Sequence, residues 1–346
     1  MRRRRSHRPS RPRRHRPAAD AANDLPVVRA SSPGDLLSLI PYLLGFQPEE
    51  SLVMLAFAGK RVVFTARVDL PVPANAFEHG TAELVAEHFA GLARHHGADG
   101  VLLAAFTRHE AEGAAVLGVA QEVCGGLLLS AWVSDGQTFC AVHHGVAGPA
   151  EPYDPQTSAA VATAVYEGMT VLPSRDDVAA SAAADPPERR TRVKELLGRF
   201  PARQMTEAQE RLDELVDGYA ELRLLSEDEI AELLVLCRDL AVRDRAWTVM
   251  SRDNADVALD FWGQVARAAP LDDSAPAVSL MGMAAWVSGN GALMLCCADR
   301  VAVEHPRYSM GQLLMDLAVS SVHPKEWEEI RHHLTDDDHG VDHSAA

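Results

Sequence analysis

The sequence contains few aromatic residues and no apolar run long enough to cross a membrane. Aromatic residues make up 5% of the 346 residues while hydrophobic residues make up 47%, so Ala, Val and Leu must fill the cores. The longest apolar runs, such as residues 52–58, fall far short of the roughly 20 residues that a transmembrane helix needs. We therefore predict no membrane segment, and the length of the chain predicts two domains.

Cysteine is scarce and shows no regular spacing. The five cysteines are an odd number and form no C-x-x-C pair, whereas disulfide frameworks and structural metal sites show clearer spacing. The N-terminus also lacks the apolar segment of a secretory signal. These absences predict reduced thiols and a cytoplasmic location.

The common catalytic and cofactor-binding motifs are missing as well. The sequence has no G-x-x-x-x-G-K-[ST] loop, no G-x-S-x-G elbow and no H-E-x-x-H pair. Its 15 histidines form no pattern of three or four converging ligands, as a metal site would require. We predict no metal, no cofactor and no catalytic residue.

The charge is divided unevenly along the chain. The net charge is −16, yet residues 1–16 carry nine arginines and no acid, so the remainder is strongly acidic. An acidic body repels phosphate backbones, which predicts no nucleic-acid partner except a weak one through residues 1–16. Residues 1–24 have nothing to bury and are expected to form a disordered Arg-rich tail. They could be a tether to an anionic surface, or an extension from a start codon placed too far upstream, so whether they are translated stays open.

Ordered structure is expected to begin with a buried helix that ends at Gly45. Ser32 can cap this helix and Pro33 suits its first turn. A hairpin follows, with strands over residues 51–57 and 61–69 and a two-residue turn at Gly59-Lys60.

Further alternating elements follow the hairpin. Helices are expected over about 76–96, 109–124 and 156–167, and strands over 101–107, 127–134 and 137–142. The order ββαβαββ predicts an α+β or α/β fold, in which a mixed β-sheet carries flanking helices. This α/β module is expected to span residues 25–180.

The second half of the chain has a helical pattern. An Ala- and Pro-rich linker is expected over 181–189, a helical module of five to seven short helices over 190–334, and a disordered acidic tail over 335–346. Three pairs have the spacing of capping boxes: Thr206 with Gln209, Ser226 with Glu229, and Ser309 with Gln312.

Polar residues gather at the open end of the first hairpin. A turn at Gly59-Lys60 would place Glu50 opposite Asp69, with Arg67 diagonal to Glu50. This acid–arginine–acid set could bind a cationic or polar ligand. It could equally be a structural charge network, which the sequence favours.

Ser174 and Arg175 form a second candidate, at a strand end that leads into a helix. Such a position can bind an anion, but Ser174 followed by two aspartates is also a good helix cap, and capping is the favoured interpretation. Tyr42 and Ser51 complete the set of candidate ligand-binding residues.

Several stretches resemble a known family. They are Pro41–Phe46, Ser51–Val53, Ala66–Pro71, Leu172–Arg175, Gly289–Ala292 and Pro306–Ser309. Together they are similar to the actinobacterial family known as domain of unknown function 4192. The resemblance covers about residues 25–330 and implies one architecture over that length. It implies no activity, ligand or partner, so no functional residue can be carried over from it.

The leading hypothesis is a non-catalytic intracellular protein that binds a partner protein or a small ligand. The helical module is the favoured surface for a protein partner. One alternative is an enzyme of unassigned type with a polar site around Arg67, Asp69, Ser174 and Arg175. A weaker alternative is a nucleic-acid-associated factor that acts through the Arg-rich tail. The ligand and the oligomeric state are left open.

Overall fold

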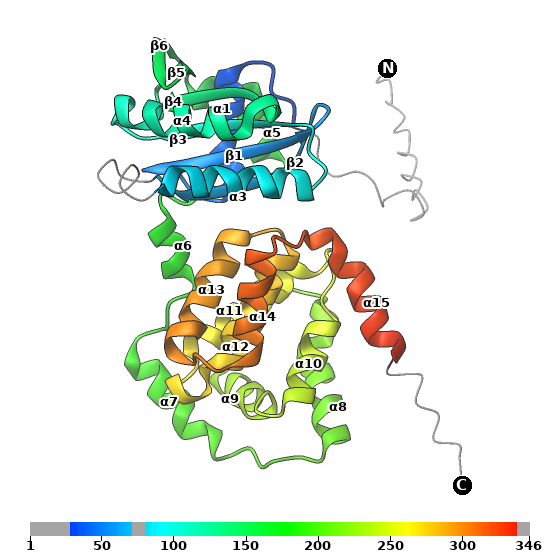
Figure 1. Cartoon of the computed structure of the whole chain (residues 1–346). Helices are drawn as coiled ribbons and strands as arrows, with labels where there is room; N and C mark the ends of the chain where they lie inside the picture. Colours follow the sequence, from blue (N-terminus) through cyan, green and yellow to red (C-terminus); the bar gives the residue numbers. More distant parts are fainter. Residues whose placement is uncertain (1–27, 71–79, 338–346) are drawn as a thin grey trace, which may run out of the picture.

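A computed structural model describes residues 28–70 and 80–337 of this chain. Within them, a β-sheet flanked by helices is followed by a bundle of helices (Figure 1). We call residues 33–172 the sheet region and residues 175–337 the helical region. The predicted tail 1–24 lies outside the described residues, as do the first residues of the helix predicted over 76–96.

The first helix, α1 (Pro33–Leu44), forms as its sequence predicts. The Ser32 hydroxyl accepts a hydrogen bond from the Asp35 backbone N–H at 3.1 Å, and Gly45 ends the helix with a φ of 80°. This left-handed conformation costs glycine little because it has no Cβ.

The six strands form one mixed sheet in the order β2-β1-β3-β4-β5-β6. They are β1 (Ser51–Ala58), β2 (Arg61–Asp69), β3 (Gly100–Phe106), β4 (Leu128–Ser134), β5 (Thr138–His143) and β6 (Val146–Pro152). Only the β3–β4 pair is parallel. The predicted fold class, a mixed sheet with flanking helices, is confirmed.

The sixth strand, β6, is absent from the prediction. It contains Gly148, Pro149 and Pro152, which are poor strand formers because proline cannot donate a hydrogen bond to a neighbouring strand. Proline is tolerated in β6 because this strand lies at the edge of the sheet and pairs only with β5.

The register of the first hairpin differs from the prediction. Ala58 pairs with Arg61, as expected, but a bulge leaves Val63 without an opposite residue and shifts the pairs beyond it by one. Ser51 therefore lies opposite Asp69, and the predicted pairing of Glu50 with Asp69 is wrong. Nothing in the hydrophobic alternation of the strand signals this extra residue.

The sheet has helices on both faces. α3 (Thr81–His95) and α4 (Glu110–Cys124) cover one face, where Phe89 and Leu117 pack against Leu52 and Met54 of β1. α1 covers the other face, packing against the alternate side chains of β1, and α5 (Ala159–Tyr166) packs on α1. Both faces of β1 are thus buried, as its continuous apolar sequence requires.

The helical region contains ten α-helices among residues 175–337, of which nine begin after residue 186. They are α6 (Arg175–Ser181), α7 (Pro187–Leu197), α8 (Met205–Val216), α9 (Glu227–Leu236), α10 (Leu240–Thr248), α11 (Ala255–Ala268), α12 (Ser274–Val287), α13 (Gly291–Glu304), α14 (Ser309–Val319) and α15 (Trp327–Asp337). The prediction of five to seven was too low because the helices are short and closely spaced.

Of the three predicted capping boxes, only the one at Ser226 forms. The Ser226 hydroxyl and the Glu229 carboxylate each accept a hydrogen bond from the other residue's backbone N–H. α8 begins at Met205, so Thr206 lies within the helix, and α14 begins at Ser309 itself. A capping residue must lie just before the first helical residue, and that position is held by Gln204 in α8 and by Tyr308 in α14.

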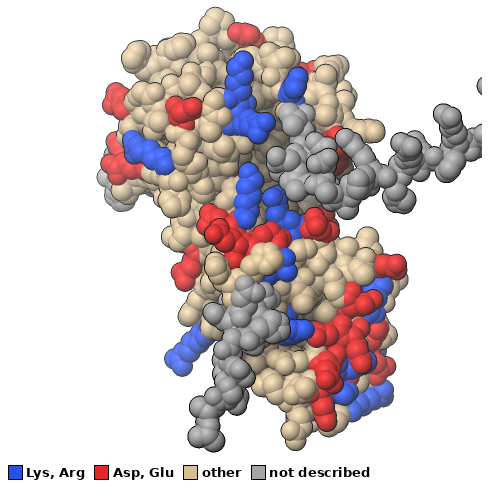
Figure 2. All heavy atoms as spheres, turned by 90° about the vertical axis from the view of Figure 1, so that its right-hand side faces the viewer, with Lys and Arg blue, Asp and Glu red and all other residues tan. Residues whose placement is uncertain are grey.

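The two regions meet at the loop that follows α1. Phe46 and Leu172 form a parallel bridge: the Gln47 N–H donates to the Leu172 carbonyl at 2.9 Å, and the Leu172 N–H donates to the Gly45 carbonyl at 2.9 Å. The buried Phe46 ring belongs to the apolar core of the helical region, as does Val178 of α6. Acidic and basic side chains gather where the regions meet (Figure 2).

Candidate functional site

A cavity of about 270 Å³ opens on the α1 face of the sheet region. Leu37, Pro41, Phe106 and Val171 form its apolar wall. It lies at the carboxyl end of β3, beside the β4–β5 turn. In open α/β sheets, ligands bind in crevices outside the carboxyl ends of strands. We call this cavity the Tyr42 cavity, after the predicted candidate residue that lines it.

Two hydroxyl groups in the lining already have partners. The Ser38 hydroxyl donates to the Gly34 carbonyl at 2.7 Å. The Tyr153 hydroxyl lies 2.9 Å from the Ser134 hydroxyl, which itself donates to the Thr138 carbonyl at 2.9 Å. Tyr153 is therefore the donor to Ser134, and burial raises the pKa of Tyr153. The phenol stays protonated and keeps a lone pair for a ligand.

Two further polar groups in the lining have no partner within the described part of the chain. They are the hydroxyl of Tyr42 and the side-chain amide of Gln47, both half-buried. The Gln47 backbone N–H donates to the Leu172 carbonyl, which fixes the position of the residue. The Gln47 side-chain amide takes no part in this contact. None of the described residues that line the cavity carries a charge. The cavity thus offers hydrogen-bonding groups in an uncharged setting.

The predicted residues Ser51, Arg67 and Asp69 do come together, but outside this cavity. Arg67 Nε donates to the Ser51 hydroxyl at 2.9 Å, and Arg67 Nη1 forms an ion pair with Asp69. The Ser51 hydroxyl donates to the Glu49 carbonyl at 2.6 Å. Burial lowers the pKa of Arg67, although Asp69 opposes this shift. Ser51, Arg67 and Asp69 therefore use one another as hydrogen-bond and ion-pair partners.

Glu50 belongs to a different contact. The Thr107 hydroxyl lies 3.0 and 2.9 Å from the two Glu50 carboxylate oxygens. Glu50 has a φ of 40°, in the left-handed region. The bulge in β2 accounts for its separation from Asp69, since it moves Glu50 beyond the last pair of the ladder.

Ser174 caps α6. Its hydroxyl accepts from the Asp177 N–H at 3.1 Å and lies 2.6 Å from the Asp177 carboxylate. Arg175 lies 3.7 Å from Asp299 of α13, and it is near enough to Arg67 to lower that residue's pKa further. The structure therefore brings Arg67, Asp69 and Arg175 near one another, but neither cavity described here includes them.

Sequence reasoning missed Gln47 and Tyr153. Gln47 directly follows the Pro41–Phe46 motif, and this position is the one feature of the sequence that could have marked it as a candidate. Tyr153 follows the unpredicted strand β6, and its backbone N–H donates to the Gln137 carbonyl at 2.9 Å. No local pattern marks Tyr153, because the contact depends on the β4–β5 turn.

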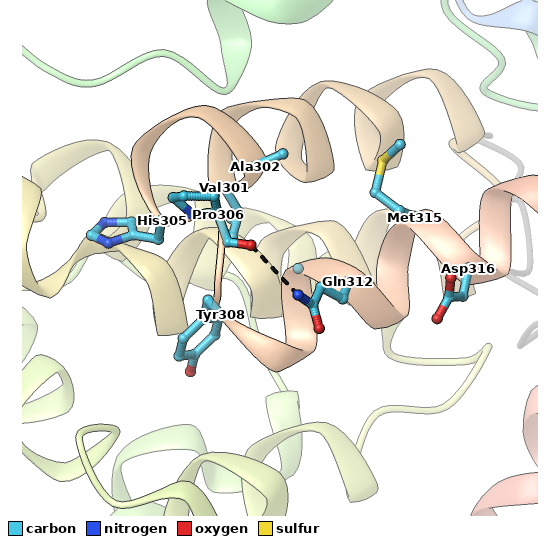
Figure 3. A pocket seen from close by; sticks show the side chains of 9 residues that line it. Val301, Ala302, His305, Pro306, Tyr308, Gln312, Met315 and Asp316 are labelled. Carbon is cyan, nitrogen blue, oxygen red and sulfur yellow. Dashed lines mark hydrogen bonds between the residues drawn. The ribbon is translucent and has the colours of Figure 1, made fainter.

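A second, smaller cavity of about 170 Å³ lies between α13 and α14. Val301 and Ala302 come from α13, and Met315 from α14 (Figure 3). The Tyr308 hydroxyl is occupied by Arg243 Nη1 at 2.9 Å, and Gln312 Nε2 lies 3.5 Å from the Pro306 carbonyl. This groove offers mainly apolar contact.

The cysteines and acidic residues supply no metal centre among the residues that the structure describes. No group of three or more His, Cys, Asp or Glu side chains converges there. All five cysteines are free and buried, and burial raises the pKa of Cys237 and of Cys297 to about 12. Such thiols are poor nucleophiles.

The described residues include no helix long and apolar enough to span a membrane.

Comparison with known proteins identifies a family but no better-understood relative. No curated protein and no solved structure matches the chain. Residues 33–325, which include α1, the whole sheet and the helices through α14, match one family along their full length. The chain therefore belongs to the family described as "Domain of unknown function (DUF4192)".

Proposed function

We propose that this chain is a non-catalytic protein that binds a small, uncharged ligand in the Tyr42 cavity. The observation that carries the proposal is the pair of half-buried polar side chains, Tyr42 and Gln47, that line the cavity without a partner among the described residues. Both side chains are half-buried, so each is free to pair with a ligand, and one such hydrogen bond contributes about 1 kcal/mol to affinity.

The lining supports binding rather than catalysis. General acid–base catalysis needs a group whose pKa lies near the working pH, usually His, Glu, Asp or Lys. The described lining residues include none of these. The Tyr153 phenol has its pKa raised, away from that range.

The size and chemistry of the cavity define the ligand class. Ligand cavities commonly measure about 300–1,000 Å³, so one of about 270 Å³ suits a small molecule. The apolar wall favours a flat or branched hydrocarbon part, and Tyr42, Gln47 and Tyr153 favour a neutral hydrogen-bonding edge. Phenols and aromatic amides have this combination.

The other hypotheses have weaker support. An enzyme site around Arg67, Asp69 and Arg175 would use groups that already pair with each other or with Asp299. A protein partner on the helical region would have the α13–α14 groove, which is mainly apolar. A cytoplasmic location, which we include in the proposal, is supported by five free thiols.

The proposal is tested with phenol and benzamide as probes in ligand-observed NMR. We expect both probes to show saturation transfer from the wild-type chain. We expect Gln47→Leu and Tyr42→Phe each to weaken the affinity about fivefold, since one neutral hydrogen bond contributes about 1 kcal/mol.

The control is Leu43→Ala, which changes an exposed neighbour on α1 and should leave probe binding unchanged. Absence of binding to the wild type, or equal affinities for all four proteins, would contradict the proposed site.

A further inference from the structure

The sheet and helical regions touch at a second place, far in sequence from the Phe46 ring that packs in the helical core. His96 follows the end of α3, and His323 lies between α14 and the short 3-10 helix η6 (Pro324–Glu326). Their ring centroids are 6.5 Å apart. Figure 1 shows the turn between α14 and α15 below α3, and α6 at the opposite side of the boundary.

His96 is placed so that a second proton on its ring is unfavourable. The ring stacks on Phe64 of β2, with centroids 4.2 Å apart and an interplanar angle of 12°. Its Nε2 is buried, and no described residue offers it a hydrogen bond. Burial disfavours a charged ring at this position and outweighs the Ser321 backbone of the helical region, which favours the protonated form.

His323 is held neutral by a different contact. Its Nδ1 accepts a hydrogen bond from the Lys325 backbone N–H at 3.0 Å and so caps η6. An imidazolium ring has a proton on both nitrogens and can accept no hydrogen bond. Protonating His323 therefore breaks the cap.

The charges around the two rings strengthen this preference. His95 faces His96 from α3. Lys325 of η6 and Arg252, from the segment between α10 and α11, face His323, and Glu326 is the acidic group that faces both rings. Burial is the main cause that lowers the pKa of both histidines, and the positive neighbours add to it. Each ring, once protonated, also repels the other.

We propose that the His96–His323 contact is a pH-sensitive latch between the sheet region and the helical region. Neutral rings pack together and hold this edge of the boundary closed. Protonated rings separate, and the regions part at this edge while the Phe46 ring, packed in the core of the helical region, keeps them connected elsewhere.

The direction of the pH dependence follows from proton linkage. A separated histidine has its ordinary pKa of about 6.5, whereas in the closed contact each pKa is lower. The open form therefore binds more protons, so the closed form is fully favoured above about pH 6.5 and loses that advantage as the pH falls.

The test measures the distance between the two regions in the full chain. Spin labels are placed at Leu84→Cys on α3 and Val303→Cys on α13, where both native side chains are exposed. The five native cysteines are buried, so they do not compete for the label. Pulsed electron paramagnetic resonance should show a shift to longer distances between pH 7.5 and pH 5.5.

Two variants distinguish the latch from a general effect of acid. His323→Asn keeps a side-chain acceptor for Lys325 but cannot be protonated, so only His96 still titrates at the contact and the shift in distance between the two pH values should be clearly smaller than in the parent chain. His88→Asn removes an exposed histidine of α3 and should respond to pH like the parent chain.

The proposal is overturned if the labelled parent chain shows the same distances at both pH values, or if His323→Asn responds as the parent does. Circular dichroism at both pH values checks that each protein stays folded. If His323→Asn does not fold, His96→Asn replaces it under the same criteria.

Discussion

The helical region contains buried charged and amide side chains that are hydrogen-bonded, whereas the sheet region leaves two neutral, half-buried side chains in a cavity without a partner among the residues that the structure describes. In the helical region, Glu232 is buried and accepts hydrogen bonds from both Arg203 and Arg211. Gln264 in the same region accepts from the Leu225 N–H and donates to the Arg223 carbonyl. Glu232 and Gln264 are therefore paired, as most buried polar groups are, whereas Trp247 Nε1 and Ser279 Oγ of the same region are buried without a hydrogen-bond partner among the described residues.

The sheet region leaves two neutral side chains unpaired in its cavity, in addition to the buried His96 Nε2 and Gln121 Oε1, which also have no partner among the described residues. Tyr42 and Gln47 line a cavity without partners among the described residues, whereas Arg67 pairs with Ser51 and Asp69 outside it. Arg67 and Asp69, which draw attention in the sequence, thus pair with each other rather than facing the cavity. The neutral groups Tyr42 and Gln47 are the ones to which we assign binding in our proposal.

The largest effect is expected in the helical region, for Glu232→Gln. Removing the Glu232 charge weakens its hydrogen bonds to Arg203 and Arg211 and costs about 2 kcal/mol in the free energy of unfolding, since both arginines are partly exposed and Arg211 also pairs with Glu214. Urea denaturation measures it. Glu210→Gln, at an exposed position on α8, is the control, and equal stability of the two variants would refute the structural role of Glu232.

A smaller loss is expected where the two regions are joined, for Ser174→Ala. The Ser174 hydroxyl caps α6, and losing such a cap costs about 1 kcal/mol in the free energy of unfolding. Thr191→Ala on α7 serves as the control, because the Thr191 hydroxyl only bonds to a carbonyl of its own helix. If the serine variant unfolds at the same urea concentration as the control, Ser174 has another role.

A pH-dependent effect is expected at the start of α1. Hydrogen bonds from Ser158, and next from Ser31, lower the pKa of Asp35 from 3.8 to about 2. The folded chain thus binds the proton less well than the unfolded chain, so Asp35 stabilises the fold above pH 3.8 and loses this effect as the pH falls toward 2.

The measurement is the unfolding midpoint in urea as a function of pH for the parent chain and Asp35→Asn. The variant should lose stability less steeply than the parent below pH 3.8. Glu122→Gln, at an exposed position on α4, should follow the parent, and parallel curves for all three would argue against the Asp35 contribution.

The smallest effect on stability is expected in the Tyr42 cavity. Tyr42→Phe and Gln47→Leu remove polar groups that make no hydrogen bond to the described residues, so the free energy of unfolding should change by less than about 0.5 kcal/mol. Urea denaturation beside Glu232→Gln makes the comparison direct. A loss as large as that of Glu232→Gln would show that these groups hold the fold.

Local signals in the sequence predict a good part of the fold. The cap at Ser32, the end of α1 at Gly45, the turn at Gly59-Lys60 and the box at Ser226 all appear where expected. Each depends on contacts within a few residues. The edge strand β6 and the bulge at Val63 were missed because neighbouring strands, rather than local preference, decide them.

The candidate site was only partly predictable. Tyr42 and the Arg67–Asp69 pair were singled out, and the pair does form. Gln47 and Tyr153 were not, because their shared position depends on the loop after α1 meeting the segment after β6. A one-residue slip in a hairpin was enough to separate Glu50 from Asp69.

The sequence by itself determined the class of the fold, the first helix and hairpin and the absence of long apolar segments, because periodicity, turns and caps act over short distances. Only the tertiary structure decided which polar groups stay unpaired and which regions touch. Tyr42 lies beside Tyr153, and His96 beside His323, through packing of segments far apart in the chain. Such contacts depend on the combined geometry of the sheet and helices, which no short stretch of sequence contains.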